Sequence, residues 1–437
     1  MTTTEAVLPL FRKLLAAVKE EGAEPRSTTS SASTNASRDT AEADAWRLVL
    51  EQALASVQHI PEYAVAVEGL RSHEQLKKRL DEVVGIRGMG LSFWSPRSVL
   101  QGILQRLLPD RGAVRELPDP TIAEAIETVV GERSAIFGLV RYIAPLFGLR
   151  LDAAPIQFSE ELAIVKMTDK EVALVNQTNL QVPLVAGGDP VSAHDRCAID
   201  LRLSRPVLIG DLGNPVEEMD AIEAPFRAVQ RVLLALRLLK AGDLVCPGIV
   251  ATSPQSTFTQ TRYFHDTGRI RHSDPYKLAA ADLALVKEIL EQLAQLAVVE
   301  NKALQVALRR FSYALDRERS DDRLLDLAIA GEALFLPDAR GESALRFALG
   351  AAVLLEAAPE GRRQLFAFMK AVYRVRGAIA HGRSKEPAYT TLAGKKGSSE
   401  EMNADLENVL RKAIGVTLVA TISGKRKQSW EELLFRG

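Results

Sequence analysis

The sequence has little of three features that each mark a class of protein: cysteine, net charge and long apolar runs. Two cysteines, Cys197 and Cys246, are too few for a disulfide framework and lack metal-ligand spacing, which indicates a reducing compartment. A formal net charge of −1 gives no overall attraction to nucleic acid, so any such contact must come from a local basic patch. No apolar run reaches the roughly eighteen residues that a membrane helix needs, and the start of the chain lacks the basic residues of a secretory signal. We therefore expect a soluble, cytoplasmic protein.

Histidine is also scarce, with six residues in the chain. His194, His265 and His272 do not stand at helix-face spacing near a pair of carboxylates, the arrangement that a protein metal site uses most often. We therefore expect no metal, and the sequence indicates no other cofactor.

Apolar residues make up 47% of the chain and charged residues 25%, the proportions of an ordinary globular protein. A length of 437 residues allows two or three domains. Apolar spacings of three and four dominate, which predicts a mainly α fold. We expect four segments: a short helix and a disordered Ser/Thr-rich linker in 1–40, a helical region in 41–150, a small β-rich mixed α/β module in 151–270, and a helical bundle in 275–437.

The two middle segments differ in their apolar pattern. Residues 41–150 read as helices separated by prolines, and the glycines of Gly85–Gly90 read as a connection because no Gly-Lys-Ser/Thr ending follows them. After residue 150, short β-branched or alternating runs predict strands within 156–167, 172–175, 197–209, 245–252 and 257–264. Among these strands the sequence predicts one strong helix, Ala224–Leu239.

From residue 275 onward the pattern is helical. We expect amphipathic helices over 276–299 and 304–315, one that starts near Asp321 and stops before Pro337, and others over 342–357 and 402–421. A basic loop follows Gly382.

One further helix carries the strongest functional signal, the run Tyr373–Gly382. Upstream apolar residues recur on one helix face, so the helix faces a core. Arg376 and His381 are separated by four residues, and Gly382, a residue favoured just past helix ends, places His381 in the last turn or at the cap. Five positions rotate a helical side chain by about 140°. Either the helix end unwinds or another chain completes a site that needs both residues.

Glu332 lies inside the apolar run of the helix that stops before Pro337. A carboxylate in apolar surroundings is costly unless it is paired. We expect an arginine partner, with Arg376 and Arg346 as candidates; the alternative is an exposed glutamate on a helix face.

These segments, Asp322–Phe335, Glu342–Ala348 and Tyr373–Gly382, resemble the ApeA-like branch of the HEPN superfamily. The resemblance implies a C-terminal HEPN-type helical bundle with an Arg-x(4–6)-His motif, and many members are metal-independent ribonucleases. Arg376 and His381 match the motif, and Glu332 matches the acidic residue of the preceding helix. The family's bundles pair, which implies a homodimer. Many active members carry a polar residue after the motif arginine, where this chain has Gly377.

The resemblance predicts a metal-independent RNA endonuclease in which His381 acts as general acid or base and Arg376 binds the phosphate. A toxin or antiviral defence role is what the family implies. Candidate contacts to the RNA backbone are Arg374, Arg383 and Lys385. Two alternatives remain: an inert HEPN module that binds RNA or nucleotide as a sensor or scaffold, and a helical interaction protein in which the motif stabilises the bundle.

Overall fold

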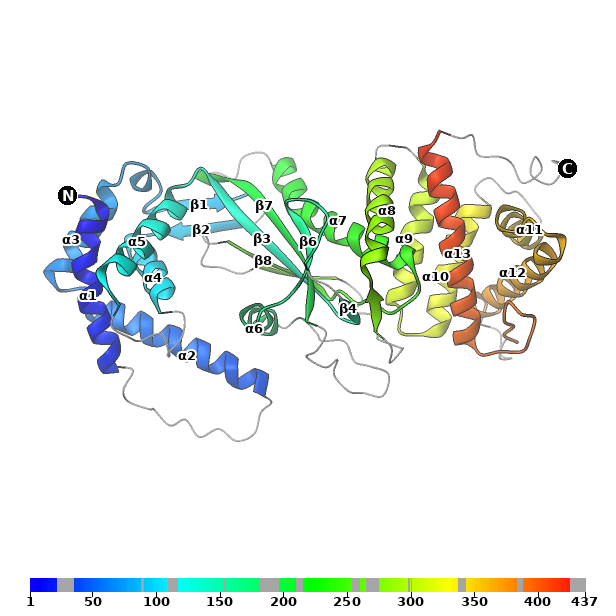
Figure 1. The fold of residues 1–437 in the computed structure, drawn as a ribbon, viewed down its shortest axis with the longest axis horizontal. Helices are drawn as coiled ribbons and strands as arrows, with labels where there is room; N and C mark the ends of the chain where they lie inside the picture. The colour runs from blue at the N-terminus through cyan, green and yellow to red at the C-terminus, as the bar shows by residue number, and fades with distance from the viewer. Residues whose placement is uncertain are drawn as a thin grey trace.

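A computed structural model gives the fold (Figure 1). It describes residues 1–21, 35–87, 90–108, 117–151, 155–178, 180, 196–209, 215–253, 260–264, 275–297, 299, 301–336, 343–382 and 388–424. Within these residues the fold is mainly α, as predicted, with a sheet between two helical regions. None of the helices in the described ranges combines the length and the apolar character needed to cross a bilayer.

The N-terminal helices pack around one core. They are α1 (Thr3–Glu21), α2 (Asn35–Ser56), α3 (Pro61–Ser72), η1 (Leu76–Lys78), α4 (Pro96–Leu107) and α5 (Asp119–Ser134). Leu10 and Phe11 of α1 are fully buried with Leu54, Leu70 and Leu100 of the later helices, so α1 belongs to this unit. The disordered linker predicted within residues 1–40 is partly wrong, because α2 already begins at Asn35; residues 22–34 lie outside the described residues.

An eight-stranded antiparallel sheet occupies the middle of the molecule (Figure 1). Its strands are β1 (Glu82–Ile86), β2 (Gly90–Trp94), β3 (Phe137–Leu146), β5 (Ile156–Gln157), β6 (Leu162–Lys166), β7 (Cys197–Ile209), β8 (Gly248–Thr252) and β9 (Gln260–Tyr263). Neighbouring strands follow the order β2-β1-β7-β3-β8-β9, and β6 pairs with β5 and β7.

The sheet corrects the prediction of an all-helical segment over 41–150. Strands β1, β2 and β3 lie in that segment, because short apolar runs do not distinguish a strand from a buried helix. Of these glycines, Gly85 and Gly90 lie in the paired strands β1 and β2, where Ile86 faces Gly90. A strand does precede these glycines, but a second strand follows them, so they lack the strand-to-helix context of a phosphate loop.

A helix covers each face of the sheet. On one face Val140 and Tyr142 of β3 join the core formed with Val229 and Leu236 of α7 (Pro215–Leu239). On the other face Ile143 and Ala198 pack with Val175 of α6 (Asp169–Gln177). The strand predicted over 172–175 is therefore wrong; Thr168 and Glu171 form a capping box that starts α6 instead. We refer to the eight strands with α6 and α7 as the sheet module.

The C-terminal bundle contains six helices in the described residues. They are α8 (Leu283–Leu296), α9 (Lys302–Asp316), α10 (Ser320–Phe335), α11 (Ser343–Leu355), α12 (Pro359–Ala380) and α13 (Ser399–Ile422). The helix expected from residue 276 starts only at Leu283, because β10 (Tyr276–Leu278) pairs in parallel with β4 (Leu149–Leu151). The buried side chains of the bundle and of the sheet module form one continuous apolar cluster.

We predict that Gly331→Ala destabilises the protein, although Gly-to-Ala changes inside helices usually stabilise by up to about 1 kcal/mol. A Cβ at Gly331 would lie 2.8 Å from Cε2 of Phe347. The Phe347 ring is fully buried between Phe335 and Tyr373, so it cannot turn away freely. We expect a loss of about 1–3 kcal/mol in the free energy of unfolding, measured by urea titration.

The matched control is Gly415→Ala in the interior of α13. A Cβ there would meet nothing within 4 Å, so this change should stabilise or be neutral. Equal stabilisation by both changes would contradict the packing assigned to Gly331.

Candidate functional site

Helix α12 carries the motif and is anchored by one apolar face. Leu365, Phe368, Met369, Val372 and Val375 are buried on that face. Pro359 occupies its first turn, where the missing N–H costs no helical hydrogen bond. The buried stripe fixes the rotation of α12, and with it the direction of every other side chain on the helix.

The end of α12 has the geometry that the sequence predicted. His381 is the C-cap residue and is exposed, and its N–H donates to the Gly377 carbonyl at 3.2 Å. Gly382 follows with φ of 59°, the left-handed conformation that glycine adopts without strain. The helix continues to Ala380 without unwinding, so the rotation of about 140° between Arg376 and His381 is retained.

Glu332 of α10 pairs with Arg376 of α12, which confirms the predicted arginine partner. Nε of Arg376 lies 3.3 Å from Oε1 of Glu332, and a terminal guanidinium nitrogen donates to Oε2 at 3.4 Å. The Arg376 side chain is 30% exposed and the Glu332 side chain is 23% exposed. Charge-assisted hydrogen bonds are usually about 2.7–2.9 Å long. The pair is therefore loose, and Nε makes no hydrogen bond of good geometry.

A pocket of about 570 Å³ opens beside Glu332. Glu332 and Tyr373 line it from α10 and α12, with Lys302 and Val306 from α9 and Ser343 from α11. The guanidinium carbon of Arg376 lies 6.0 Å from the centre of the Tyr373 ring. We call Glu332, Tyr373, Arg376 and His381 the Arg376 site.

Chemically, the Arg376 site offers a cation beside a pocket and an ionisable imidazole at the nearby helix end. A guanidinium held loosely by one carboxylate keeps donors for a phosphate oxygen. His381 is exposed at the cap and makes no hydrogen bond or ion pair through its side chain to the described residues.

Of the three predicted contacts to the RNA backbone, one lies in the described part of the chain. Arg374 is exposed on α12, whereas Arg383 and Lys385 lie outside the described residues.

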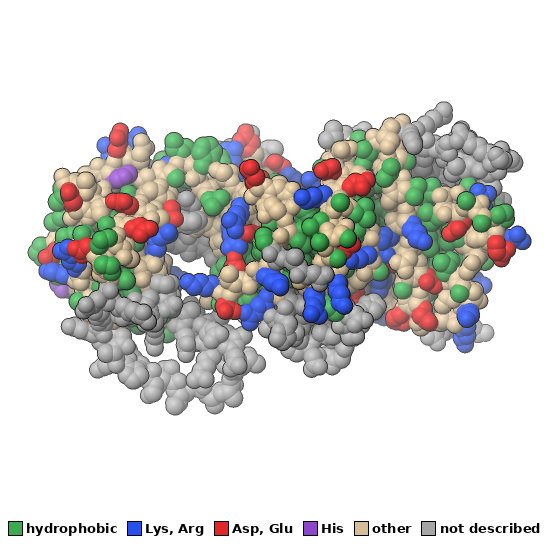
Figure 2. Space-filling model, in the orientation of Figure 1, with side chains coloured by type: hydrophobic (Ala, Val, Ile, Leu, Met, Phe, Trp, Pro, Cys, Tyr) green, Lys and Arg blue, Asp and Glu red, His purple; other side chains and the backbone are tan. Residues whose placement is uncertain are grey.

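On the face in Figure 2, Lys and Arg side chains gather over the sheet module and its junction with the bundle, despite the net charge of −1. Within the described part of the chain, no group of three or more His, Cys, Asp and Glu side chains is arranged to hold a metal ion.

Sequence reasoning missed Lys302 and Ser343 in the pocket and a second, larger cavity. That cavity, of about 990 Å³, lies between α7, β9, α8 and α9. Its lining is rich in arginines from three elements that are far apart in sequence. The one signal that could have found it is the spacing of Arg227 and Arg231, which places both on one face of α7.

No protein-family model, curated protein or solved structure matches the chain.

We predict that Glu332→Gln lowers the free energy of unfolding by no more than about 1 kcal/mol, because partly exposed, loosely paired ions contribute little. The matched control is Glu407→Gln in α13. Glu407 is 4% exposed and accepts hydrogen bonds from Arg323 and Arg411, so its loss should cost about 3 kcal/mol or more.

Urea unfolding of both variants beside the wild type measures the difference. Equal destabilisation by the two changes would mean that the Glu332–Arg376 pair holds the bundle together instead of remaining available to a ligand.

Proposed function

We propose that this protein is an RNA endonuclease of HEPN type, with the Arg376 site as its active site. The observation that carries the proposal is the loose Glu332–Arg376 pair at a pocket, five residues before an exposed histidine on the same helix. A structural pair would be expected to be tight and closed. This one leaves the guanidinium able to change partner.

The proposed reaction is an attack by a ribose 2′-oxygen on the adjacent phosphorus. The P–O5′ bond breaks, which leaves a cyclic phosphate on one fragment and a 5′-hydroxyl on the other. His381 takes the proton from the 2′-hydroxyl or gives one to the 5′-oxygen. Arg376 binds the phosphate and stabilises the charge of the crowded intermediate, and Glu332 positions Arg376. This chemistry needs no metal.

The unbroken helix supports a site shared between two chains. Because Arg376 and His381 of one chain point about 140° apart, one phosphate reaches both groups only if a second copy supplies one of them. We propose a homodimer in which Arg376 of one protomer acts with His381 of its partner. Arg374, Arg383 and Lys385 are the proposed contacts to the RNA backbone. Such a nuclease would suit a cytoplasmic toxin or antiviral defence effector controlled by the N-terminal regions.

We predict that the purified protein cleaves RNA in excess chelator and that His381→Ala and Arg376→Ala each reduce the rate by about 100-fold or more. Labelled single-stranded and structured RNAs, with analysis of the fragment ends, provide the measurement. Matched controls are His59→Ala, an exposed histidine of the N-terminal region, and Arg363→Ala, an exposed arginine on α12. Cleavage that survives in both site variants would place the activity elsewhere.

We also predict that two inactive chains complement each other. A heterodimer of His381→Ala and Arg376→Ala chains retains one intact pair, with Arg376 from the first chain and His381 from the second. Co-expression with two different tags and tandem purification should restore a substantial fraction of the wild-type rate. If each site used both residues of one chain, the heterodimer would stay as inactive as its parents.

A second candidate function is an inert HEPN module that binds RNA or nucleotide as a sensor or scaffold. Gly377 favours it, because the position after the motif arginine has no polar side chain. A Cβ there would meet nothing within 4 Å, so packing does not require the glycine. Binding of RNA without cleavage under every condition above would identify this function.

A further inference from the structure

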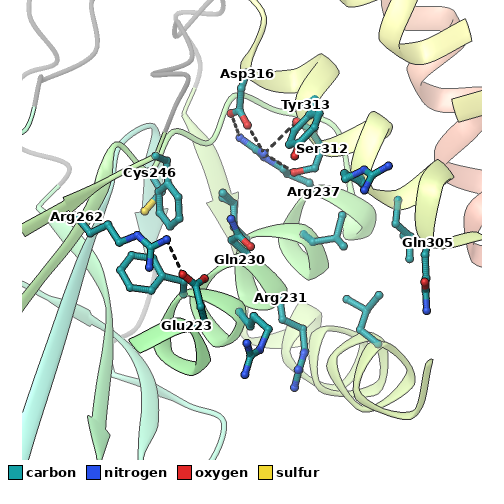
Figure 3. A pocket seen from close by; sticks show the side chains of 18 of the residues that line it. Glu223, Gln230, Arg231, Arg237, Cys246, Arg262, Gln305, Ser312, Tyr313 and Asp316 are labelled. Carbon is teal, nitrogen blue, oxygen red and sulfur yellow. Dashed lines mark hydrogen bonds and ion pairs between the residues drawn. The ribbon is translucent and has the colours of Figure 1, made fainter. Parts of the chain in front are cut away.

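The cavity of about 990 Å³ lies where the sheet module meets the bundle (Figure 3). Helix α7 and strand β9 form the walls on the sheet side, and α8 and α9 form those on the bundle side. We call it the junction cleft. Its volume is within the range of about 300–1,000 Å³ that small-molecule sites occupy.

The lining of the junction cleft carries more positive than negative charge. Six arginines line it and only two carboxylates, Glu223 and Asp316. Figure 3 shows these acids engaged by Arg262 and Arg237, and Arg262 lies 2.6 Å from Glu223.

The other four arginines divide into two kinds. Arg227 pairs with Asp220 and Arg317 with Asp326, both outside the lining. Arg231 of α7 and Arg309 of α9 have no acidic partner among the described residues. Two guanidinium groups that no described carboxylate neutralises therefore line the cleft from two different walls, which favours an anion with several oxygens.

Aromatic side chains line the same cleft. Phe226 and Phe264 meet edge to face with ring centres 6.1 Å apart, and the guanidinium of Arg262 lies 4.0 Å from the Phe226 ring centre. Tyr263 and Tyr313 remain 51% and 45% exposed. Half-exposed aromatic rings in the same cleft as these two guanidiniums form a surface that suits a flat ring joined to phosphate.

The remaining polar groups of the cleft are already occupied or neutral. Arg237 is buried and donates to Ser312 Oγ at 3.0 Å and to the Leu244 carbonyl at 2.9 Å, so it forms the wall. Burial raises the pKa of the Cys246 thiol to about 12, so this thiol adds no negative charge that would oppose an anion.

We propose that the junction cleft binds a nucleoside phosphate, with the phosphates on Arg231 and Arg309 and the base against Tyr313 and its aromatic neighbours. The cleft shares no lining residue with the pocket beside Glu332, and the proposed ligand is separate from the RNA that the nuclease would cut. Two sources can supply this chemistry: a free nucleotide and the end of a short RNA strand.

The test measures binding, so it does not depend on whether the Arg376 site cleaves RNA. Titration calorimetry with the full-length protein carrying His381→Ala, so that the proposed nuclease does not cut the RNA probe, would use ATP, GTP, CTP, UTP, a short single-stranded RNA, adenosine and inorganic triphosphate. We expect at least one nucleotide or the RNA to bind, and adenosine to bind at least about 10-fold more weakly than its phosphorylated form. The tighter of nucleotide and RNA identifies the source.

Variants locate the site. The double change Arg231→Gln/Arg309→Gln should weaken binding by about 100-fold, because each guanidinium lost removes a charge-assisted contact worth about 10-fold. The matched control is Lys287→Gln/Lys412→Gln, which removes two charges from exposed positions outside the lining. Tyr313→Ala should weaken nucleotide binding by about 10-fold and leave inorganic triphosphate binding unchanged.

Three outcomes would overturn the proposal. The first is no binding of any nucleotide or RNA at millimolar concentration by protein whose circular dichroism is that of the folded chain. The second is equal binding by the arginine variant and its lysine control. The third is inorganic triphosphate binding as tightly as every nucleotide with no effect of Tyr313→Ala, which would reduce the cleft to a phosphate site.

Discussion

The buried guanidinium of Arg237 is the interaction on which the arrangement of the two larger parts of the molecule depends. Its side chain is 1% exposed and reaches from α7 into the bundle, where it bonds Ser312 and Asp316 of α9. It also donates to the Leu244 carbonyl in the connection to β8, while Arg411 of α13 donates to the Arg237 carbonyl at 2.8 Å. An unpaired buried charge is very costly. Helix α7 can therefore lie against α9 and α13 only where all these partners are within reach.

Helix α9, which Arg237 holds against α7, lines both the junction cleft and the pocket beside Glu332. One part of α9 carries Arg309 and Tyr313 on the wall of the junction cleft, and its N-terminal residues Lys302 and Val306 line the pocket beside Glu332. Helix α9 also packs along α10, which carries Glu332, and the Arg310–Asp326 pair joins them at 2.7 Å. A ligand that moved α9 would act on both cavities, because one rigid element contributes a wall to each.

Much of the C-terminal half follows from the sequence, because long amphipathic helices leave a strong period. The stripe of α12, the cap at His381 and the left-handed Gly382 all follow from local pattern. The cost of an isolated carboxylate predicted an arginine partner for Glu332, but the sequence left Arg376 and Arg346 as candidates and the structure decides for Arg376. The sequence pattern did not predict strands β1 and β3 or the short β10. A few apolar residues fit a strand or a helix equally, and the choice depends on distant pairing partners. The junction cleft was missed for the same reason. Its arginines come from three elements, and no local spacing joins Arg231 to Arg309.

The ion pairs of the bundle are of two kinds: short pairs that stabilise the fold, and one longer pair that lies beside a pocket. Glu407 lies between Arg323 and Arg411, and Asp326 binds Arg310 and Arg317 at 2.7 and 2.8 Å, so each oxygen of these two carboxylates already has a guanidinium partner. The Glu332–Arg376 pair is longer, more exposed and beside a pocket. Under the proposed function Arg376 exchanges its carboxylate partner for a phosphate, and a pair that held the helices together could not do so without loosening the fold. The tight pairs at Asp326 and Glu407 join α10 to α9 and α13, so under the proposed function α10 would stay fixed while Arg376 changes partner.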